Sequence, residues 1–148
     1  MAQERVFLAG AAGAIGARLT PLLVKAGYAV FGTTRDPRKA ALIEANGAMP
    51  VIVDVFDADA LRAEVAKVQP HAVVHQLTDL PPGLDKSRMA EAVVRNAAIR
   101  TKGTRNLVNA ALEAGCHRMI SQSIAWLYAQ GAAPFIEVAC GAGDAAWL

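Results

Sequence analysis

Three glycines near the start of the chain, spaced three residues apart, most constrain what the chain can fold into. The segment VFLAGAAGAIGARL begins as an apolar run, meets Gly10, Gly13 and Gly16, and continues with apolar residues at helical spacing. In such a turn one glycine permits a sharp reversal, one lets another molecule approach the backbone, and one lets the helix pack closely on the strand. The pattern predicts a strand, a glycine turn and a helix in direct succession.

The rest of the chain alternates between strand-like and helix-like segments. Apolar runs indicate strands at residues 5–10, 28–34, 49–55, 71–77 and 116–125, and helical spacing indicates helices at 14–27, 36–47, 57–69 and about 88–114. Such alternation is typical of βαβ units, in which helices cover both faces of a parallel sheet. We therefore expect one α/β domain over residues 1–148. We expect it to be a doubly wound, Rossmann-type parallel sheet with strand order 3-2-1-4-5 that ends after the fifth strand.

The composition excludes several classes of protein. The 148 residues are 54% hydrophobic and 19% charged with a net charge of +2, which fits neither a nucleic-acid binder nor a disordered chain. Two cysteines, Cys116 and Cys140, and three histidines lack the spacing of a metal site, so we expect no metal. The apolar start is too short to span a membrane. We expect a reduced, cytoplasmic protein that binds neither nucleic acid nor membrane.

The position of the glycine turn points to a phosphate ligand. A helix that starts directly after such a turn presents free backbone N–H groups and a partial positive charge, which favour a pyrophosphate. Spaced glycines also arise by chance in a chain rich in alanine and glycine, so the motif alone is weak. The agreement of strand, turn, helix and N-terminal position favours a dinucleotide-binding site.

The glycine segment GAAGAIG resembles the cofactor loop of the extended short-chain dehydrogenase/reductases, the NAD-dependent epimerase/dehydratase family. Further segments resemble that family in the same order along the chain: VDVFD, VVHQLTD, GTRNLVNAA and MISQSIA. The resemblance implies a nicotinamide dinucleotide cofactor and a catalytic serine at Ser123. It implies cofactor contacts in the glycine turn at Gly10, Gly13, Ala14, Ile15 and Gly16, after the second strand at Thr34 and Arg35, near the adenine at Asp54 and Val55, and near the nicotinamide at Gln76 and Leu77.

Several of these positions also have a structural interpretation. Asp54 is alternatively a helix cap, and Ser123 is alternatively a strand-end serine that caps the next segment. His75, to which we assign no catalysis, is alternatively a core histidine with satisfied hydrogen bonds. Three residues before the glycine of its G-T motif the family usually has asparagine, where this chain has Arg100. Asn96 lies one helical turn earlier and is placed to share a face with Arg100, which leaves the substrate role of that helix open.

The residues after the second strand favour NADP over NAD. In family members that bind NAD an acidic residue ends this strand and takes the ribose hydroxyls, whereas this chain has Thr34 followed by Arg35. A carboxylate would repel a 2′-phosphate, whereas a guanidinium grips it with paired N–H donors. Arg38 and Lys39 add positive charge, but we interpret them as solvated residues at a helix start. We expect NADP as the preferred cofactor and NAD as the alternative.

The tyrosine–lysine pair on which the family's chemistry depends is missing from this chain. The pair lies four residues apart beyond the serine strand, but here Ala132 lies four residues after Tyr128, and no lysine follows Lys102. We interpret residues 129–148 as an atypical, truncated or frame-shifted tail, with the substrate-binding part absent. We expect the cofactor-binding domain of an epimerase, dehydratase or reductase, catalytically incomplete as this chain. The alternative is a non-catalytic dinucleotide-binding sensor or interaction module.

The resemblance also implies partners for the chain. The parent enzyme would act on a small-molecule or nucleotide-linked substrate. Family members pair the helices beside the fourth and fifth strands across a two-fold axis, so we expect a homodimer. Apolar positions on the helix at about 88–114 are the candidates for this contact, although some of them must face the sheet. They are Val93, Val94, Ile99, Leu107 and Val108.

Overall fold

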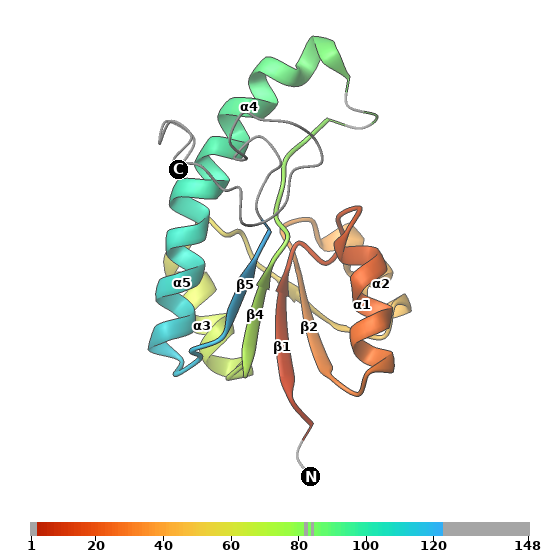
Figure 1. The fold of residues 1–148 in the computed structure, drawn as a ribbon, viewed down its shortest axis with the longest axis vertical. Coiled ribbons are helices and arrows are strands. Elements are labelled where there is room, and N and C mark those ends of the chain that lie inside the picture. The colour runs from red at the N-terminus through yellow and green to blue at the C-terminus, as the bar shows by residue number, and fades with distance from the viewer. Residues whose placement is uncertain (1–2, 82, 84, 123–148) are drawn as a thin grey trace, which may run out of the picture.

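The computed structural model describes residues 3–81, 83 and 85–122, which form one sheet with helices on both faces (Figure 1). Five parallel strands lie in the order β3-β2-β1-β4-β5. This order and the shared direction of the strands confirm the doubly wound α/β fold that the sequence predicts. The strands are β1 (Arg5–Ala9), β2 (Ala29–Thr34), β3 (Met49–Ile52), β4 (Ala72–His75) and β5 (Met119–Ser121).

The helices form a layer on each face of the sheet (Figure 1). One layer holds α1 (Gly16–Lys25) and α2 (Ala40–Ala45), and the other holds α3 (Ala58–Val68) and α5 (Thr104–Glu113). Parallel strands need such crossover helices, because the chain must return to the same end of the sheet before each new strand. All five strands therefore end at one edge, and the loops that follow them gather there. The remaining helix, α4 (Met89–Ala98), extends past that edge (Figure 1).

The buried part of strand β1, residues 6–9, shows why its sequence is an unbroken apolar run. Val6 and Leu8 pack into the core beside α1 and α2, whereas Phe7 and Ala9 pack into the core beside α3 and α5. Side chains alternate between the two faces of a strand, so a strand covered on both faces must be apolar at every position. Phe7 is completely buried, and burying a side chain of this kind stabilises the fold by about 1.5–3 kcal/mol.

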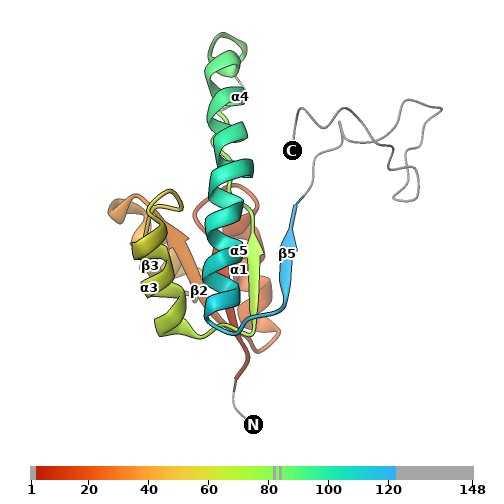
Figure 2. The same ribbon diagram turned by 90° about the vertical axis from the view of Figure 1, so that its left-hand side faces the viewer.

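The helical column that leads from α4 to α5 is continuous but not regular (Figure 2). It opens with a 3-10 turn, Lys86–Arg88, and a π-helical segment, Ile99–Gly103, joins α4 to α5. The chain is therefore helical over the predicted range of about 88–114, but it does not form the single regular α-helix that was predicted. The wide turn is stabilised because the Thr104 hydroxyl donates to the Ile99 carbonyl at 3.3 Å, five residues back. Gly103 lets this turn pass close to Val55, whose Cγ1 would lie 3.1 Å from an added Cβ.

Two other elements differ from their predicted extents. The helix expected at 36–47 is a 3-10 turn, Pro37–Lys39, followed by the six-residue α2, and Asp36 caps the turn by accepting the Arg38 N–H at 3.1 Å. Of the strand expected at 116–125, Met119–Ser121 pairs with β4. Residues 123–125 lie outside the described residues, as does the tail interpreted at 129–148.

Candidate functional site

A pocket of about 630 Å³ opens at the carboxyl edge of the sheet, where the loops after the strands meet. The fold thus brings together segments that are far apart in the sequence. Of the eleven residues predicted to contact a cofactor, Gly16 does not line this pocket and the other ten do. Ser123, the predicted catalytic residue, lies outside the described residues, and its neighbour Gln122 lines the pocket. The ten residues are Gly10, Gly13, Ala14, Ile15, Thr34, Arg35, Asp54, Val55, Gln76 and Leu77.

Gly10 makes the reversal after β1. Its φ of +91° lies in the left-handed region, which side chains disfavour. A Cβ here would also lie 3.0 Å from the carbonyl carbon and oxygen of Gln76 in the neighbouring loop. The Gly10 N–H donates to Thr33 Oγ1 of β2 at 3.1 Å, which anchors the turn to the sheet. Contacts within the protein therefore explain this glycine completely.

The other two glycines of the turn differ in what surrounds them. Gly16 is buried at the start of α1, and a Cβ there would lie 2.1 Å from the carbonyl oxygen of Gly10. No side chain fits at that separation. Gly13 is exposed on the pocket wall, where a Cβ would have one tight contact, 3.2 Å from the same oxygen. The internal packing therefore requires Gly16 strictly and Gly13 only weakly. The Gly13 N–H donates to the Gly10 carbonyl at 3.0 Å, so what Gly13 leaves to a ligand is the space beside its Cα.

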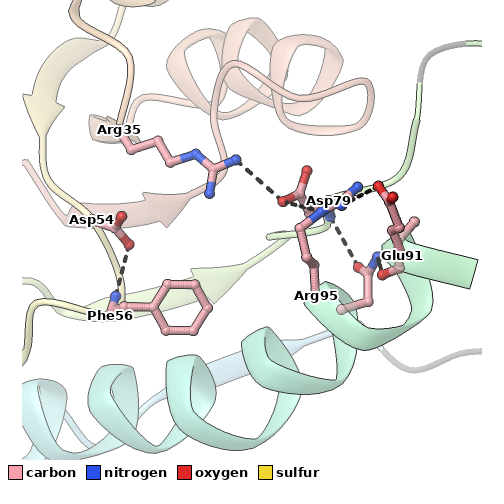
Figure 3. Close-up of polar contacts among 8 residues, drawn as sticks. Arg35, Asp54, Phe56, Asp79, Glu91 and Arg95 are labelled. Carbon is pink, nitrogen blue, oxygen red and sulfur yellow. Dashed lines mark hydrogen bonds and ion pairs between the residues drawn. The ribbon is translucent and has the colours of Figure 1, made fainter. Parts of the chain in front are cut away.

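At the end of β2, a hydroxyl and a guanidinium reach the pocket. Thr34 Oγ1 accepts the Asp36 N–H at 3.1 Å, so the hydroxyl that replaces the usual acid is used to shape the turn. Arg35 is exposed and pairs with Asp79 across the pocket, as Figure 3 shows. Arg38 pairs instead with Asp36 at 2.9 Å, and its hydrogen bond to that carboxylate lowers the pKa of Asp36. Arg35 lines the pocket and Arg38 does not, which agrees with the sequence interpretation, but Lys39, interpreted with Arg38 as a solvated residue at a helix start, also lines the pocket.

The segment after β3 is held in place by a helix residue from elsewhere in the chain. Asp54 Oδ1 accepts the Phe56 N–H at 2.9 Å (Figure 3), which folds the segment into a tight turn. The cap of α3 is Asp57, so the interpretation of Asp54 as a helix cap is wrong. Asn106 of α5 donates its side-chain amide to the carbonyl of Val55 at 2.9 Å. This contact, which the sequence did not predict, fixes the predicted adenine side of the pocket.

His75, at the end of β4, is a satisfied core histidine. Its Nδ1 accepts the Leu77 N–H at 3.2 Å, so Nε2 carries the proton and donates to Thr104 Oγ1 at 3.0 Å. Burial lowers the pKa of His75, and the nearby Arg100 guanidinium lowers it further. The neutral ring shapes the loop after β4 and holds it to α5, so its role is structural, as one of the two interpretations of the sequence had it.

Gln76 places an unpaired polar atom at the pocket. Its side-chain Oε1 is buried and has no hydrogen-bond partner within the described part of the chain. Leaving such an acceptor without a donor costs about 1–3 kcal/mol, which native proteins usually avoid. Its position on the pocket wall suits a ligand that carries N–H donors, and the carboxamide of a nicotinamide is one such group. This amide and the open space beside Gly13 fit the dinucleotide predicted from the sequence.

A charged cluster that the sequence did not predict lies across the pocket from β2. Asp79, in the loop after β4, pairs with Arg35 at 3.3 Å and with Arg95 of α4 at 3.2 Å. Asn96 accepts the Asp79 N–H at 3.0 Å. Arg100 donates to the backbone carbonyl of Gln122 at 3.5 Å. Asn96 and Arg100 therefore position two different loops at the pocket mouth.

Some classes of site are not found among residues 3–81, 83 and 85–122. No group of three histidine, cysteine or acidic side chains is placed to hold a metal ion. No helix in this range is both long and apolar enough to cross a membrane. Cys116 is buried as a free thiol.

Comparison with known proteins shows which family this chain matches. Residues 6–143 match the model of the NAD dependent epimerase/dehydratase family. The chain is 38% identical over 133 residues to 3-diazoavenalumate denitrifying reductase of a Streptomyces species, covering 90% of this chain and 42% of the relative. It is 34% identical over 128 residues to cinnamoyl-CoA reductase 1 of Oryza sativa subsp. japonica, covering 82% and 34%.

A solved structure shares the fold. The UDP-glucose-4-epimerase from Stenotrophomonas maltophila matches with a TM-score of 0.75 at 22% identity, over 93% of this chain and 42% of that one. The chain spans less than half the length of each of these three proteins. The family match extends over nearly the whole chain, from β1 past β5. The protein therefore belongs to the NAD-dependent epimerase/dehydratase family.

Proposed function

We propose that this chain is the NADP(H)-binding domain of a reductase in this family. The observation that carries the proposal is the convergence of the predicted contact residues on one pocket that contains an unsatisfied hydrogen-bond acceptor. Ten predicted contact residues converge on the pocket, Gly13 leaves space beside its Cα there, and Gln76 presents a buried acceptor without a donor. Each of these features is accounted for by one dinucleotide lying along the carboxyl edge of the sheet.

Different residues of the pocket suit different parts of the dinucleotide. The N-terminal end of α1 carries the partial positive charge of the helix dipole, and with the exposed residues Gly13 and Ala14 on the pocket wall it suits the pyrophosphate. Asp54 and the backbone of Val55 suit the adenine, and Asn106 holds that segment. Gln76 suits the nicotinamide carboxamide, because the buried Oε1 needs an N–H donor.

The preference for NADP is part of the proposal and rests on Arg35. The guanidinium lies at the pocket with its side chain 59% exposed, so it can turn toward a phosphate without unpacking the core. No carboxylate stands at Thr34, where one would repel a 2′-phosphate. Charge-assisted, paired hydrogen bonds from arginine are the usual means of recognising a phosphate group.

The reaction of the parent enzyme is proposed from the chain's own residues and its relatives. A bound nicotinamide supplies hydride transfer, while Ser123 would orient the substrate oxygen. The two curated relatives described above are named as reductases, which favours reduction over epimerisation or dehydration. The substrate remains a small-molecule or nucleotide-linked compound. Without a tyrosine–lysine pair, this chain alone has no tuned proton donor.

A second candidate function follows from that missing pair. A dinucleotide-binding module without catalysis, such as a redox sensor, needs the pocket and not the tyrosine and lysine. This chain has the pocket and lacks the tyrosine–lysine pair. The DNA downstream of codon 148 distinguishes the candidates. A Y-x-x-x-K encoded there in any frame favours the enzyme, and its absence favours the module.

We also propose a homodimer and a cytoplasmic location. Of the apolar positions expected at the dimer contact, Ile99 and Leu107 are buried in the core and are therefore excluded. Val94 is 70% exposed and Val93 is 38% exposed, so α4 offers the contact instead, while Val108 is half-buried. Light scattering at micromolar concentration should give a dimer mass, and a monomer mass would contradict this part of the proposal. The free thiol of Cys116 is compatible with a reducing compartment.

Calorimetric titration of the 148-residue chain with NADP⁺ and NAD⁺ tests the proposed function. We expect both to bind and NADP⁺ to bind more tightly, and a chain that binds neither would refute the proposal. Turnover is measured separately with NADPH and a panel of aldehydes, acyl thioesters and nucleotide sugars. We expect no appreciable turnover from this chain. Robust turnover that survives Ser123→Ala and Tyr128→Phe would contradict the assignment of chemistry to this family's site.

A further inference from the structure

Four charged side chains form a cluster beside the pocket, and the proposed cofactor contacts use only Arg35 of these. Asp79 Oδ2 pairs with Arg35 Nη2 at 3.3 Å and with Arg95 Nε at 3.2 Å, so two guanidiniums share one carboxylate oxygen (Figure 3). Arg95 also pairs with Glu91, one turn earlier on α4, at 3.5 Å. Arg35 and Asp79 both line the pocket. The arginine expected to hold the 2′-phosphate is therefore already paired.

The pair between Arg35 and Asp79 spans the pocket. Arg35 follows β2 and Asp79 follows β4, and β1 lies between those strands in the sheet. The ion pair thus passes the end of β1, where the glycine turn begins. A ligand that lies along this edge of the sheet must meet the pair directly.

The two partners are not equally fixed. The Asp79 N–H donates to the side chain of Asn96 at 3.0 Å, and Asn96 donates to the Ala92 carbonyl at 2.8 Å, which ties Asp79 to α4. The Asp79 side chain is 25% exposed, against 59% for Arg35. Arg35 is therefore the more exposed partner, and Asp79 is the partner whose backbone is tied to α4.

We propose that Asp79 is a specificity-determining residue of this pocket, because its carboxylate competes with the 2′-phosphate of NADP for the Arg35 guanidinium. This inference rests on the proposed function. The donors of one guanidinium suit a carboxylate or a phosphate, and Arg35 must leave Asp79 to face a phosphate at β2. Arg95 stays beside Asp79 when Arg35 turns away, so the carboxylate is not left unpaired. Asp79 thereby reduces the advantage of NADP over NAD that Arg35 alone would confer.

The test is calorimetric titration of the Asp79→Asn variant with NADP⁺ and NAD⁺ at fixed ionic strength. Exposed ion pairs are weak, so we expect the dissociation constant for NADP⁺ to fall by about two- to five-fold. The constant for NAD⁺, which has no 2′-phosphate, should stay unchanged. Glu91→Gln is the matched control, because it removes a carboxylate of the same cluster that contacts Arg95 and not Arg35. It should change neither constant.

The Arg35→Gln background separates competition from simple charge repulsion. If Asp79 acts by holding Arg35, Asp79→Asn has no effect on NADP⁺ binding once Arg35 is removed. An equal gain in both backgrounds would mean that the carboxylate merely repels the phosphate, and would overturn the inference. Binding of both cofactors with an unchanged ratio in Asp79→Asn would also overturn it and leave the proposed function standing. A native chain that binds neither cofactor would refute the proposed function and the inference with it.

Discussion

Two neighbouring loops form walls of the pocket, and different forces hold them. The glycine turn after β1 is fixed by the backbone itself, since Gly16 leaves no space beside the Gly10 carbonyl and Gly10 is bonded to Thr33. In the loop after β4, Asp79 is held by ion pairs to two guanidiniums whose side chains are 59% and 39% exposed. The first loop is a rigid part of the fold, whereas the second carries a contact that a ligand can replace.

This difference matches the parts of the ligand that each loop would meet. The energy of steric repulsion rises steeply when atoms approach by a few more tenths of an ångström. A tightly packed turn therefore presents its N–H groups in one fixed arrangement. An exposed ion pair contributes only about 0–1 kcal/mol, so it exchanges partners easily. The rigid loop suits the pyrophosphate, which every nicotinamide dinucleotide has. The exchangeable contact suits the 2′-phosphate, which only some have.

The largest expected effect is on the stability of the glycine turn. Gly16→Ala should lower the free energy of unfolding by about 3 kcal/mol or more, because its Cβ would lie 2.1 Å from the Gly10 oxygen and overpacking of this kind strains the backbone. Urea unfolding followed by circular dichroism measures the loss. Gly13→Ala is the matched control in the same turn and should lose much less. Equal stability of the two variants would show that the turn is not packed as described.

A smaller effect is expected at the exchangeable contact. Arg35→Ala should weaken NADP⁺ binding by about 1–3 kcal/mol more than NAD⁺ binding, because a charge-assisted pair to the 2′-phosphate is lost. Calorimetric titration of both cofactors gives the difference. Arg38→Ala removes an arginine that is 89% exposed and paired with Asp36, and it should leave the ratio unchanged. Equal weakening of both cofactors by Arg35→Ala would mean that Arg35 does not contact the 2′-phosphate.

The smallest expected effect is a pH dependence of stability from His75. Burial lowers the pKa of His75 in the folded chain, so below the ordinary value of 6.5 the unfolded chain binds the proton more readily. The stabilisation is complete above pH 6.5 and is lost as the pH falls through the lower, folded pKa. Unfolding free energies at pH 7.5 and 5.5 should therefore differ, and less so in His75→Asn. His117→Gln, at an exposed histidine, should keep the native difference, and a variant of His75 that also keeps it would exclude this ring as the cause.

Most of the fold was predictable because its signals are local. Each strand is a short apolar run, and each turn is marked by glycine or by a capping residue such as Asp36 or Asp57. The π-helical segment at Ile99–Gly103 was not predictable in this way. A single wide turn shifts the apolar spacing by one residue, which helical periodicity over neighbouring turns does not reveal. Its stabilising contact at Thr104 is visible only in three dimensions.

The candidate site was also predictable only in part. Its predicted pocket-lining residues lie in motifs that are continuous in sequence, so the glycine turn and the segments after β3 and β4 were found. The residues that position them come from distant segments. Asn106 reaches Val55 across 51 positions, and Arg35 reaches Asp79 across 44. No local pattern marks such pairs, because their contact depends on how the sheet and helices pack.

That the glycine turn holds the cofactor through its backbone is tested most directly by titrating NADP⁺ into Gly13→Val beside the native chain. The branched side chain fills the space that Gly13 leaves open at the pocket, so binding should be abolished while the cooperative urea transition is retained. Ala63→Val, at an exposed position on α3, controls for added bulk and should bind normally. Native affinity for NADP⁺ in a folded Gly13→Val variant would contradict the proposed site.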